Sequence, residues 1–374
     1  ELEDRLYAQL EEKVYQRTET ASLDSISRYQ HGSGVDPTRG KPDGNRTFVL
    51  SPTAPTCGIL LIHGLSDSPY SLRHIGERMY EEGAMVIGLR VPGHGTAPSG
   101  LVRTSWKDMA AAVDLAVTHL QETLGNGKPV YLIGYSNGAA LAVEHAIRCV
   151  ESPPKRQVDG LVLISAEIGL SPAAGFAAWQ GRIGFMLGLK KLAWNSISLE
   201  YDPYKYRSFA INAAHQANLI TTTIDKRLER LSDKGALDGF PKVLAYQSAV
   251  DATVLPSALV TRLFSRLSHP ENELVVYDIN RTVHVEHILS RDPAGEFDWL
   301  LDHAGGNFNL SILTNQTDEN GRRSEEAVFL DRKIDDKALQ TRSTGLKWPS
   351  DVYSLSHIAL PFPENDPVYG SGSN

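Results

Sequence analysis

The chain has 374 residues, of which 41% are hydrophobic and 22% are charged, so it is long enough and apolar enough to bury a core and is not a disordered chain. Its formal net charge of -8 and the lack of any basic run argue against a nucleic-acid-binding protein. No run of 18 or more apolar residues occurs, so we expect no transmembrane segment in the given chain.

The two cysteines, Cys57 and Cys149, are too few for a disulfide scaffold or a cysteine-rich metal site. We expect two free thiols, with a disulfide between them as the alternative. The sequence begins at Glu1 without a methionine, which indicates that an N-terminal segment was removed or left out. The sequence therefore leaves the compartment open between a cytoplasmic and an exported protein, and it gives no prediction of the oligomeric state.

The first 46 residues are predicted to form an N-terminal helix and a loop that precede the core. Residues 1–30 have the pattern of an acidic amphipathic helix packed on the outside of the domain, and 31–45 are rich in Gly, Pro and Asp, which is typical of a loop. One face of the helix would carry Leu2, Leu6, Leu10 and Val14.

Strand-like and helix-like segments then alternate along the chain. The apolar runs predict strands at 47–50, 58–62, 84–89, 130–133 and 160–165. Helical patterns cover 71–82, 106–124 with Thr104 or Ser105 as its cap, and the segment from Asn137 onward. This alternation predicts the α/β class, with a mostly parallel sheet that helices cover on both faces.

The sequence Gly134-Tyr135-Ser136-Asn137-Gly138 lies between a buried-type strand and an Ala-rich helix. A serine at the apex of a sharp strand-to-helix turn needs small neighbours, which the two glycines supply. The start of the helix also offers backbone N–H groups to a developing oxyanion. The motif G-x-S-x-G alone occurs by chance in many chains. Here the strand before it and the helix after it supply the required context, so Ser136 is the predicted nucleophile.

A second motif, His63-Gly64-Leu65, follows the strand at 58–62. A glycine at the end of a core strand lets the backbone approach a reaction centre, although a simple glycine turn is the alternative. We predict that the backbone N–H groups of Leu65 and Asn137 form an oxyanion hole.

Three motifs in this order, HGLSDSP, LRVPGHGTAPSG and GYSNGA, resemble the α/β-hydrolase superfamily, nearest to its monoacylglycerol lipase and bacterial carboxylesterase branch. The resemblance is dense over about residues 47–170 and looser afterwards. It implies the α/β-hydrolase fold, a Ser–His–Asp triad with Ser136 as nucleophile, oxyanion donors at Leu65 and Asn137, and a cap inserted late in the sheet.

The segment from Ala166 to Asp238 breaks the strand–helix rhythm and is rich in aromatic and apolar residues. We expect a helical cap insertion at 166–238, between core parts at 47–165 and 239–374, that shapes an apolar pocket for the substrate. The same residues could instead form an ordinary helical core.

The sheet resumes at 242–247, and Asp251 lies in the loop that follows. A carboxylate after a core strand, and after the serine in chain order, fits the residue that orients a catalytic histidine. Asp251 is therefore the predicted acid. Its alternatives are an Asp that only forms a turn, and Asp278 at the end of the strand 273–279 as a substitute acid.

The triad histidine is predicted to be His357, with His284 as the competitor. Spacing alone favours His284, which follows the strand at 273–279 closely. However, the structured extension to residue 374 is long for a tail, with strand-like runs at 309–314 and 327–330. The segment VYSLSHIALPFPENDPVYG resembles the C-terminal histidine segment of bacterial α/β-hydrolase esterases, with 281–350 then an insertion before it.

The predicted reaction is hydrolysis of a small ester with an apolar acyl or alcohol group, short to medium in chain length or lipid-like, through an acyl-enzyme intermediate. It needs no cofactor and no metal, and the pair His284 and His287 is weak as a metal site without further ligands. The alternatives are an amidase, a peptidase or an acyltransferase on the same triad, or a non-catalytic ligand-binding member of the fold.

Overall fold

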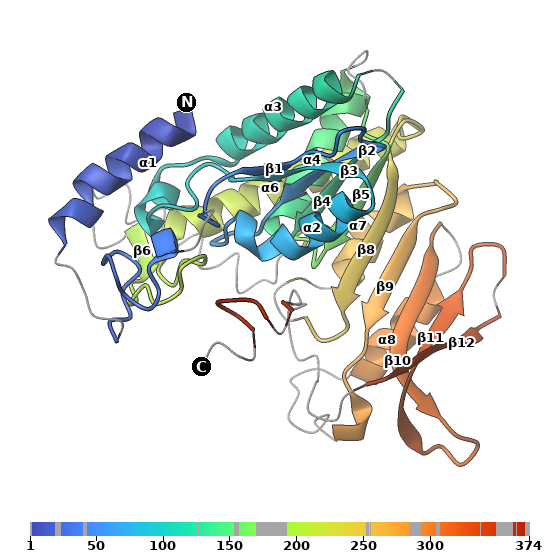
Figure 1. Cartoon of the computed structure of the whole chain (residues 1–374). Helices are drawn as coiled ribbons and strands as arrows, with labels where there is room; N and C mark the ends of the chain where they lie inside the picture. The colour runs from blue at the N-terminus through green and yellow to red at the C-terminus, as the bar shows by residue number, and fades with distance from the viewer. Residues whose placement is uncertain are drawn as a thin grey trace. The chain divides into compact units, whose positions relative to one another are not determined.

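The structure is a computed structural model of the chain (Figure 1). It forms two compact units, the first made of Glu1–Leu132, Pro172–Leu219 and Leu360–Asn374, and the second of Ile133–Ser171 and Ile220–Ala359. The described residues are 2–18, 24–39, 43–125, 127–152, 157–169, 193–251, 254, 256–283, 293–303, 307–336, 338–348, 362–363 and 365–370.

The first unit contains strands in the order β1-β3-β2-β4, and β4 continues into the second unit (Figure 1). β3 is parallel to β2 and antiparallel to the short β1. β2 and β3 are buried along nearly their whole length, as expected for apolar strands covered on both faces. The bounds are Phe48–Leu50 for β1, Cys57–Ile62 for β2, Ala84–Leu89 for β3 and Val130–Tyr135 for β4.

Helices connect these strands where the sequence predicted them. α2 spans Arg73–Glu81, and α3 spans Trp106–Leu124. Ser105 caps α3, because its side chain accepts the backbone N–H of Asp108 while the Asp108 side chain accepts the N–H of Ser105. The 3-10 helices of this unit are η1 (Tyr15–Arg17), η2 (Pro37–Arg39), η3 (Pro69–Leu72) and η4 (Pro98–Val102).

The N-terminal helix α1 spans only Leu2–Lys13, so the predicted helix over 1–30 is wrong in its length. The residues that follow favour turns. The Thr18 hydroxyl donates to the backbone carbonyls of Tyr15 and Tyr29 at 2.8 Å each, a type of bond that competes with helix.

A buried tyrosine, which the sequence did not single out, anchors α1. Tyr7 is buried, and its hydroxyl lies 2.7 Å from the carbonyl oxygen of Asn45 and 3.1 Å from that of Gly95. Of the predicted apolar face, Leu2 is 79% exposed, whereas Leu6, Leu10 and Val14 are half-buried. Local periodicity therefore did not predict which side chain fixes this helix.

The second unit contains strands in the order β4-β5-β8-β9-β10-β11-β12. β5, β8, β9 and β10 pair in parallel, whereas β11 and β12 are antiparallel, which confirms the predicted mostly parallel sheet of the α/β class. The bounds are Gly160–Ile164 for β5, Lys242–Ser248 for β8, Glu273–Tyr277 for β9, Asn309–Thr317 for β10, Arg323–Arg332 for β11 and Gln340–Lys347 for β12.

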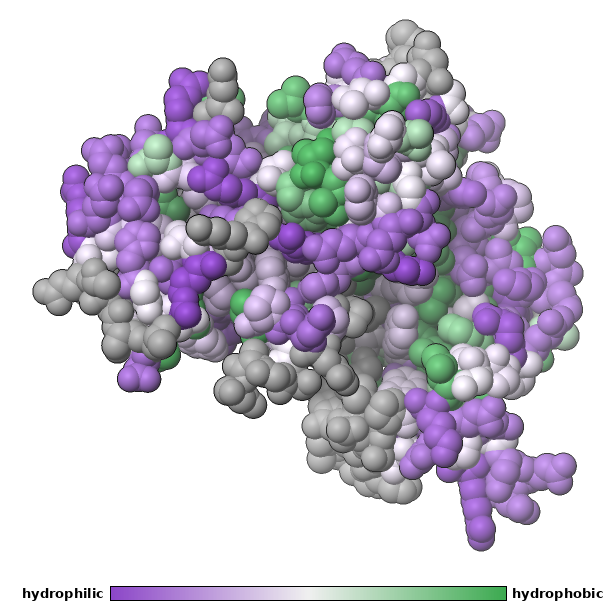
Figure 2. All heavy atoms as spheres, viewed as in Figure 1, coloured by the Kyte–Doolittle hydropathy of each residue, from purple (hydrophilic) through white to green (hydrophobic). Residues whose placement is uncertain are grey.

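The strand-like runs predicted at 309–314 and 327–330 belong to β10 and β11, which are longer than predicted. The polar turn at 318–322 between them lies in a hydrophilic part of the surface (Figure 2). β12 was not predicted, because nearly all of its residues are exposed and it lacks the apolar alternation that marks a strand.

In the second unit, α4 and the later part of α6 are joined by partly buried charge pairs. Arg227 bonds Glu144 at 2.9 Å and Glu151 at 2.6 Å. The helices are α4 (Asn137–Glu151), α6 (Ile211–Asp233, which begins in the first unit), α7 (Pro256–Arg262), α8 (Pro293–His303) and the 3-10 helices η6 (Phe264–Arg266) and η7 (Arg281–Val283).

Residues 170–192 of the predicted insertion at 166–238 lie outside the described residues, so its role as a cap stays a prediction. Its described part contains a small antiparallel pair, β6 (Trp194–Ser196) and β7 (Phe209–Ala210), before α6. Cys57 and Cys149 are free cysteines, as expected. Within the described ranges, no helix has the length and apolar character needed to cross a membrane.

Candidate active site

Ser136 lies at the turn between β4 and α4, in the second unit. Its backbone has φ 54° and ψ -114°, a conformation that L-residues rarely adopt. The turn is held because the Ser136 N–H donates to the carbonyl of Ile164 at 2.9 Å, while its carbonyl accepts the N–H of Ala139 at 3.0 Å. The predicted strained turn is therefore present, and Ser136 remains half-buried rather than enclosed.

The turn also requires a glycine before the serine. A Cβ on Gly134 would lie 2.5 Å from the Cα of Ala139 and from the carbonyl oxygen of Gly138, closer than any side chain tolerates. The strand can thus pass the helix start only if residue 134 has no side chain.

Glu167, which the sequence did not single out, borders this turn. It follows β5 and is 5% exposed. Its backbone N–H lies 3.2 Å from the carbonyl of Ser136, and its carboxylate accepts the side-chain amide of Asn137 at 3.0 Å. No motif marks such a residue, because the contact joins two loops that are distant in sequence.

Asp251 follows β8 at the same edge of the sheet, since the carboxyl ends of parallel strands face one way. The side chain is fully buried, and its two oxygens accept the backbone N–H of Val254 and the side-chain amide of Gln247, each at 3.0 Å. Gln247, also fully buried, is a second residue that the sequence did not predict. Both bonds fix the orientation of the Asp251 carboxylate.

Asp278, the substitute acid, is equally buried but has different partners. Its carboxylate accepts the Arg281 guanidinium at 2.7 Å, the Thr314 hydroxyl at 2.6 Å and the backbone N–H of Ile279 at 2.7 Å. Burial raises the pKa of Asp278, and the Arg281 pair opposes that rise. Asp278 is thus engaged in a buried ion pair within its own loop.

The predicted His63-Gly64-Leu65 segment lies in the first unit, after β2. His63 is 1% exposed; its Nδ1 donates to the Gly64 carbonyl at 2.9 Å and its Nε2 accepts the N–H of Val91 at 3.1 Å. Burial, followed by the nearby His94, holds the pKa of His63 well below its usual range. The imidazole is therefore neutral and acts as a fixed support for the loop.

A tyrosine from within the predicted cap insertion at 166–238 also supports this loop. The N–H of Tyr206 donates to the carbonyl of Ser66 at 2.8 Å, and its hydroxyl accepts the N–H of Thr96 at 2.8 Å. Ser66, directly after Leu65, has φ 72°. The Leu65 backbone is thus held beside a strained residue, in a loop fixed from two sides.

Neither candidate histidine lies among the described residues. His284 directly follows η7, which comes after β9, the strand next to β8. His357 precedes a segment that is anchored in the first unit, where Asp366 bonds the Tyr70 hydroxyl at 2.8 Å and His74 at 2.7 Å. His287 is likewise outside the described residues, whose His, Cys, Asp and Glu side chains form no group suited to holding a metal ion.

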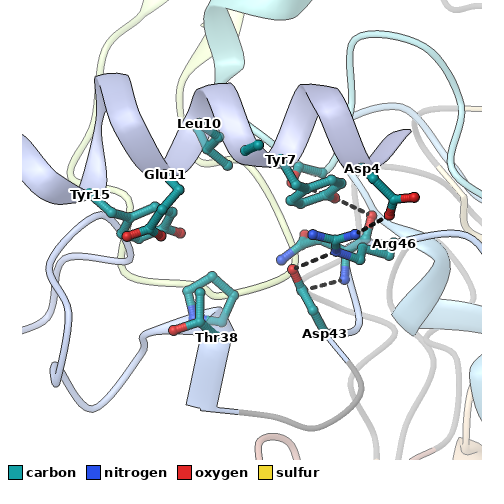
Figure 3. Close-up of a pocket in the computed structure, with 12 residues that line it drawn as sticks. Asp4, Tyr7, Leu10, Glu11, Tyr15, Thr38, Asp43 and Arg46 are labelled. Carbon is teal, nitrogen blue, oxygen red and sulfur yellow. Dashed lines mark hydrogen bonds and ion pairs between the residues drawn. The ribbon is translucent and has the colours of Figure 1, made fainter. Parts of the chain in front are cut away.

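The first unit also has a hollow of about 290 Å³ between α1 and the loop around residue 43 (Figure 3). Figure 3 shows Asp4 and Asp43 on either side of Arg46, which lies 3.0 Å and 3.9 Å from their carboxylates and 4.1 Å from the centre of the Tyr7 ring. Because these groups pair with one another, we interpret the hollow as part of the packing of α1.

Comparison with known sequences gives one family match and one relative. The family model described as serine aminopeptidase, S33, matches residues 53–281. The chain is also similar to a thermostable monoacylglycerol lipase from Bacillus sp. (strain H-257), at 29% identity over 126 residues, which is 34% of this chain and 47% of that protein. The chain thus spans about half the length of the curated relative that it matches.

Comparison with solved structures finds similar folds. A structure reported for the metagenome-derived lipolytic enzymes LipS and LipT has a TM-score of 0.50 at 22% identity, and it covers 62% of this chain and 87% of its own. A soluble variant of monoglyceride lipase from Saccharomyces cerevisiae has a TM-score of 0.50 at 13% identity, covering 62% and 82%. At these identities the similarity concerns the fold.

Proposed function

Because the chain belongs to the serine aminopeptidase S33 family and has the α/β-hydrolase fold, we propose that it is a serine hydrolase that cleaves carboxylic esters. The observation that carries this proposal is the backbone of Ser136, which has φ 54° in a turn that only a glycine at position 134 permits. Such strain is maintained where a nucleophile has to be presented at the end of a strand.

In the proposed mechanism the Ser136 oxygen attacks the ester carbonyl while a histidine takes its proton. The same histidine then protonates the departing alcohol, and water later releases the acyl group. The N–H groups of Asn137 and Leu65 would stabilise the oxyanion, at about 3 kcal/mol for each donor in comparable sites. These steps use no metal and no organic cofactor.

Asp251 is the proposed acid that holds the histidine in its reactive tautomer. Two supports for this role are its complete burial and the two hydrogen bonds that fix its carboxylate. Asp278 is less suited, because its carboxylate is already bound to Arg281 and Thr314.

The proposed histidine is His357, and His284 is the alternative. In favour of His357, Phe362 lies five residues later in the sequence and stacks on Tyr70, itself five residues after Leu65. In favour of His284, the strands that precede Asp251 and His284 are neighbours in the sheet. Direct replacement of each histidine decides between them.

The proposed substrates are short- to medium-chain or lipid-like esters, bound beneath the predicted cap at 166–238. The relative at 29% identity is named a monoacylglycerol lipase, which supports a lipid-like ester. The family description, serine aminopeptidase, makes peptide or amide hydrolysis the second candidate. An acyltransferase or a non-catalytic binding protein would share the fold as well.

The test measures hydrolysis of p-nitrophenyl esters with acyl chains from two to sixteen carbons, with aminoacyl p-nitroanilides as the peptidase arm. We expect turnover of short to medium esters, and its loss in Ser136→Ala. Full activity in Ser136→Ala would contradict the mechanism, and turnover of the anilides alone would support the peptidase.

The histidine is assigned with His357→Ala and His284→Ala in the same assay. We expect a loss of several orders of magnitude for His357→Ala and little change for His284→Ala. The opposite pattern would make His284 the base and would overturn the assignment of His357.

A further inference from the structure

Glu167 bonds both residues that form the Ser136–Asn137 peptide group. The carbonyl of this peptide belongs to Ser136, and it accepts the backbone N–H of Glu167 at 3.2 Å. The N–H of the same peptide belongs to Asn137, whose side-chain amide donates to the Glu167 carboxylate at 3.0 Å. Glu167 therefore bonds the carbonyl of this peptide through its backbone N–H, and the side chain of Asn137 through its carboxylate.

Glu167 is itself held rigidly. It is 5% exposed and Asn137 is 3% exposed, so their hydrogen bond lies where water does not compete with it. Two residues earlier, Ser165 has φ 46°, and its N–H donates to the carbonyl of Tyr246 in β8 at 2.8 Å. The loop after β5 is thus fixed to the neighbouring strand before it reaches the nucleophile turn.

We propose that Glu167 is a positioning residue that fixes the Asn137 N–H in the direction required of an oxyanion donor. This inference rests on the proposed function, in which that N–H stabilises the tetrahedral intermediate. Glu167 does not touch the substrate in this scheme. It acts through the Ser136–Asn137 peptide.

The physical basis is the rigidity of the peptide group. Because the carbonyl and the N–H of one peptide share a plane and point in opposite directions, a bond that fixes the carbonyl also fixes the N–H. The Ser136 carbonyl accepts the N–H groups of Ala139 and Ala140 as well, at 3.0 Å and 3.3 Å. An oxyanion donor stabilises the transition state only when it is aimed in advance at the position of the oxyanion.

Glu167→Ala keeps the backbone bond to the Ser136 carbonyl and removes only the carboxylate that holds the Asn137 side chain, so it tests that second bond. It is compared with Glu167→Gln, which keeps an oxygen that can accept the Asn137 amide. Glu144→Gln is the matched control, because Glu144 is also a buried glutamate of the second unit but pairs with Arg148 and Arg227. Asn137→Ala removes the same hydrogen bond from the other side and keeps its backbone N–H, so it serves if Glu167→Ala does not fold.

We expect kcat for a p-nitrophenyl ester to fall about tenfold or more in Glu167→Ala, with KM nearly unchanged, since removal of a whole oxyanion donor costs about 100- to 1,000-fold. Affinity for a trifluoromethyl ketone inhibitor, which forms the oxyanion, should fall by a similar factor. Glu167→Gln should recover most of both values, and Glu144→Gln should lower stability without changing the affinity for this inhibitor.

The variants Glu167→Ala and Asn137→Ala should not add when combined, because they remove one shared bond. The inference is overturned if folded Glu167→Ala or Asn137→Ala keeps the wild-type kcat and inhibitor affinity while Ser136→Ala is inactive. Failure of the proposed function is distinguishable from failure of this inference, because wild-type protein would then not react with a fluorophosphonate.

Discussion

Asp251 and Asp278 follow neighbouring strands of one sheet and are both fully buried, yet their carboxylates have different hydrogen-bond partners. Asp251 accepts one amide side chain and one backbone N–H, from Gln247 and Val254. Asp278 accepts the guanidinium of Arg281 in addition to a hydroxyl and a backbone N–H. Burial and place in the fold do not separate the two carboxylates, whereas their partners do.

This difference bears on function because a carboxylate that must bind a histidine cannot have its charge committed to an arginine. A buried ion pair stabilises a loop only while both partners remain, and each partner alone is costly. The described partners of the Asp251 carboxylate, Gln247 and Val254, are instead neutral donors that orient it. We therefore infer a role in catalysis for Asp251 and a role in folding for Asp278, which the following predictions test.

The largest expected effect is on activity. Asp251→Asn should lower kcat for a p-nitrophenyl ester by about 10,000-fold, as loss of the orienting carboxylate does in comparable triads, without unfolding the protein. Asp278→Asn, measured beside it, should retain activity within about tenfold when folded. If Asp278→Asn shows the larger loss of activity, the two roles are reversed.

The second effect is on stability. Asp278→Asn should lower the free energy of unfolding by about 3 kcal/mol or more, because the Arg281 guanidinium stays buried without its carboxylate. Urea denaturation measures this change. Arg281→Met in the same background should restore part of the loss, and a double variant that is less stable than either single one would argue against the pair.

The third prediction concerns His94, a buried side chain that, unlike the two carboxylates, is held in its neutral form. Burial lowers the pKa of His94 to about 4, aided by the charge of Arg90. Between pH 6.5 and about 4 the unfolded chain therefore binds a proton that the folded chain does not, so stability falls as pH falls through this window.

His94→Gln removes that proton uptake. Between pH 7.5 and pH 5 the wild type should lose about 2 kcal/mol of unfolding free energy more than the variant, since each pKa unit corresponds to 1.36 kcal/mol. Urea denaturation at the two pH values measures it. Equal losses in both proteins would show that His94 is already protonated, or readily protonated, in the fold.

The smallest effect concerns Gln247. Gln247→Leu should lower kcat for a p-nitrophenyl ester by about tenfold, because the Asp251 carboxylate loses one of the two described hydrogen bonds that fix its orientation. The replacement also removes the amide that bonds the buried Val254 carbonyl, so the free energy of unfolding should fall by about 1 kcal/mol or more. An unchanged kcat in folded Gln247→Leu would show that this hydrogen bond does not contribute to catalysis.

The sequence predicted those features that depend on local pattern. Most strands of the parallel sheet, α3 with its Ser105 cap and the strained turn at Ser136 all follow from runs of neighbouring residues. The exposed β12 has no such pattern, and α1 ends early because hydroxyl side chains such as Thr18 bond the backbone.

The hydrogen-bond partners of the site residues could not be predicted, because several of them come from segments that are far apart in the sequence. Glu167 reaches Asn137 across 30 positions of the sequence, and Thr314, within β10, reaches Asp278 across 36 positions. Such contacts depend on strand order, which one sequence does not encode locally. Asp251 and Asp278 could accordingly be proposed as candidates, but only their partners distinguish them.

The most direct test of the central claim is the site at which a fluorophosphonate probe reacts. Wild-type protein incubated with the probe, digested and analysed by mass spectrometry should carry one adduct, on the peptide that contains Ser136, and Ser136→Ala should carry none. An adduct at another residue, or no adduct on folded wild-type protein, would contradict the assignment of Ser136 as the nucleophile.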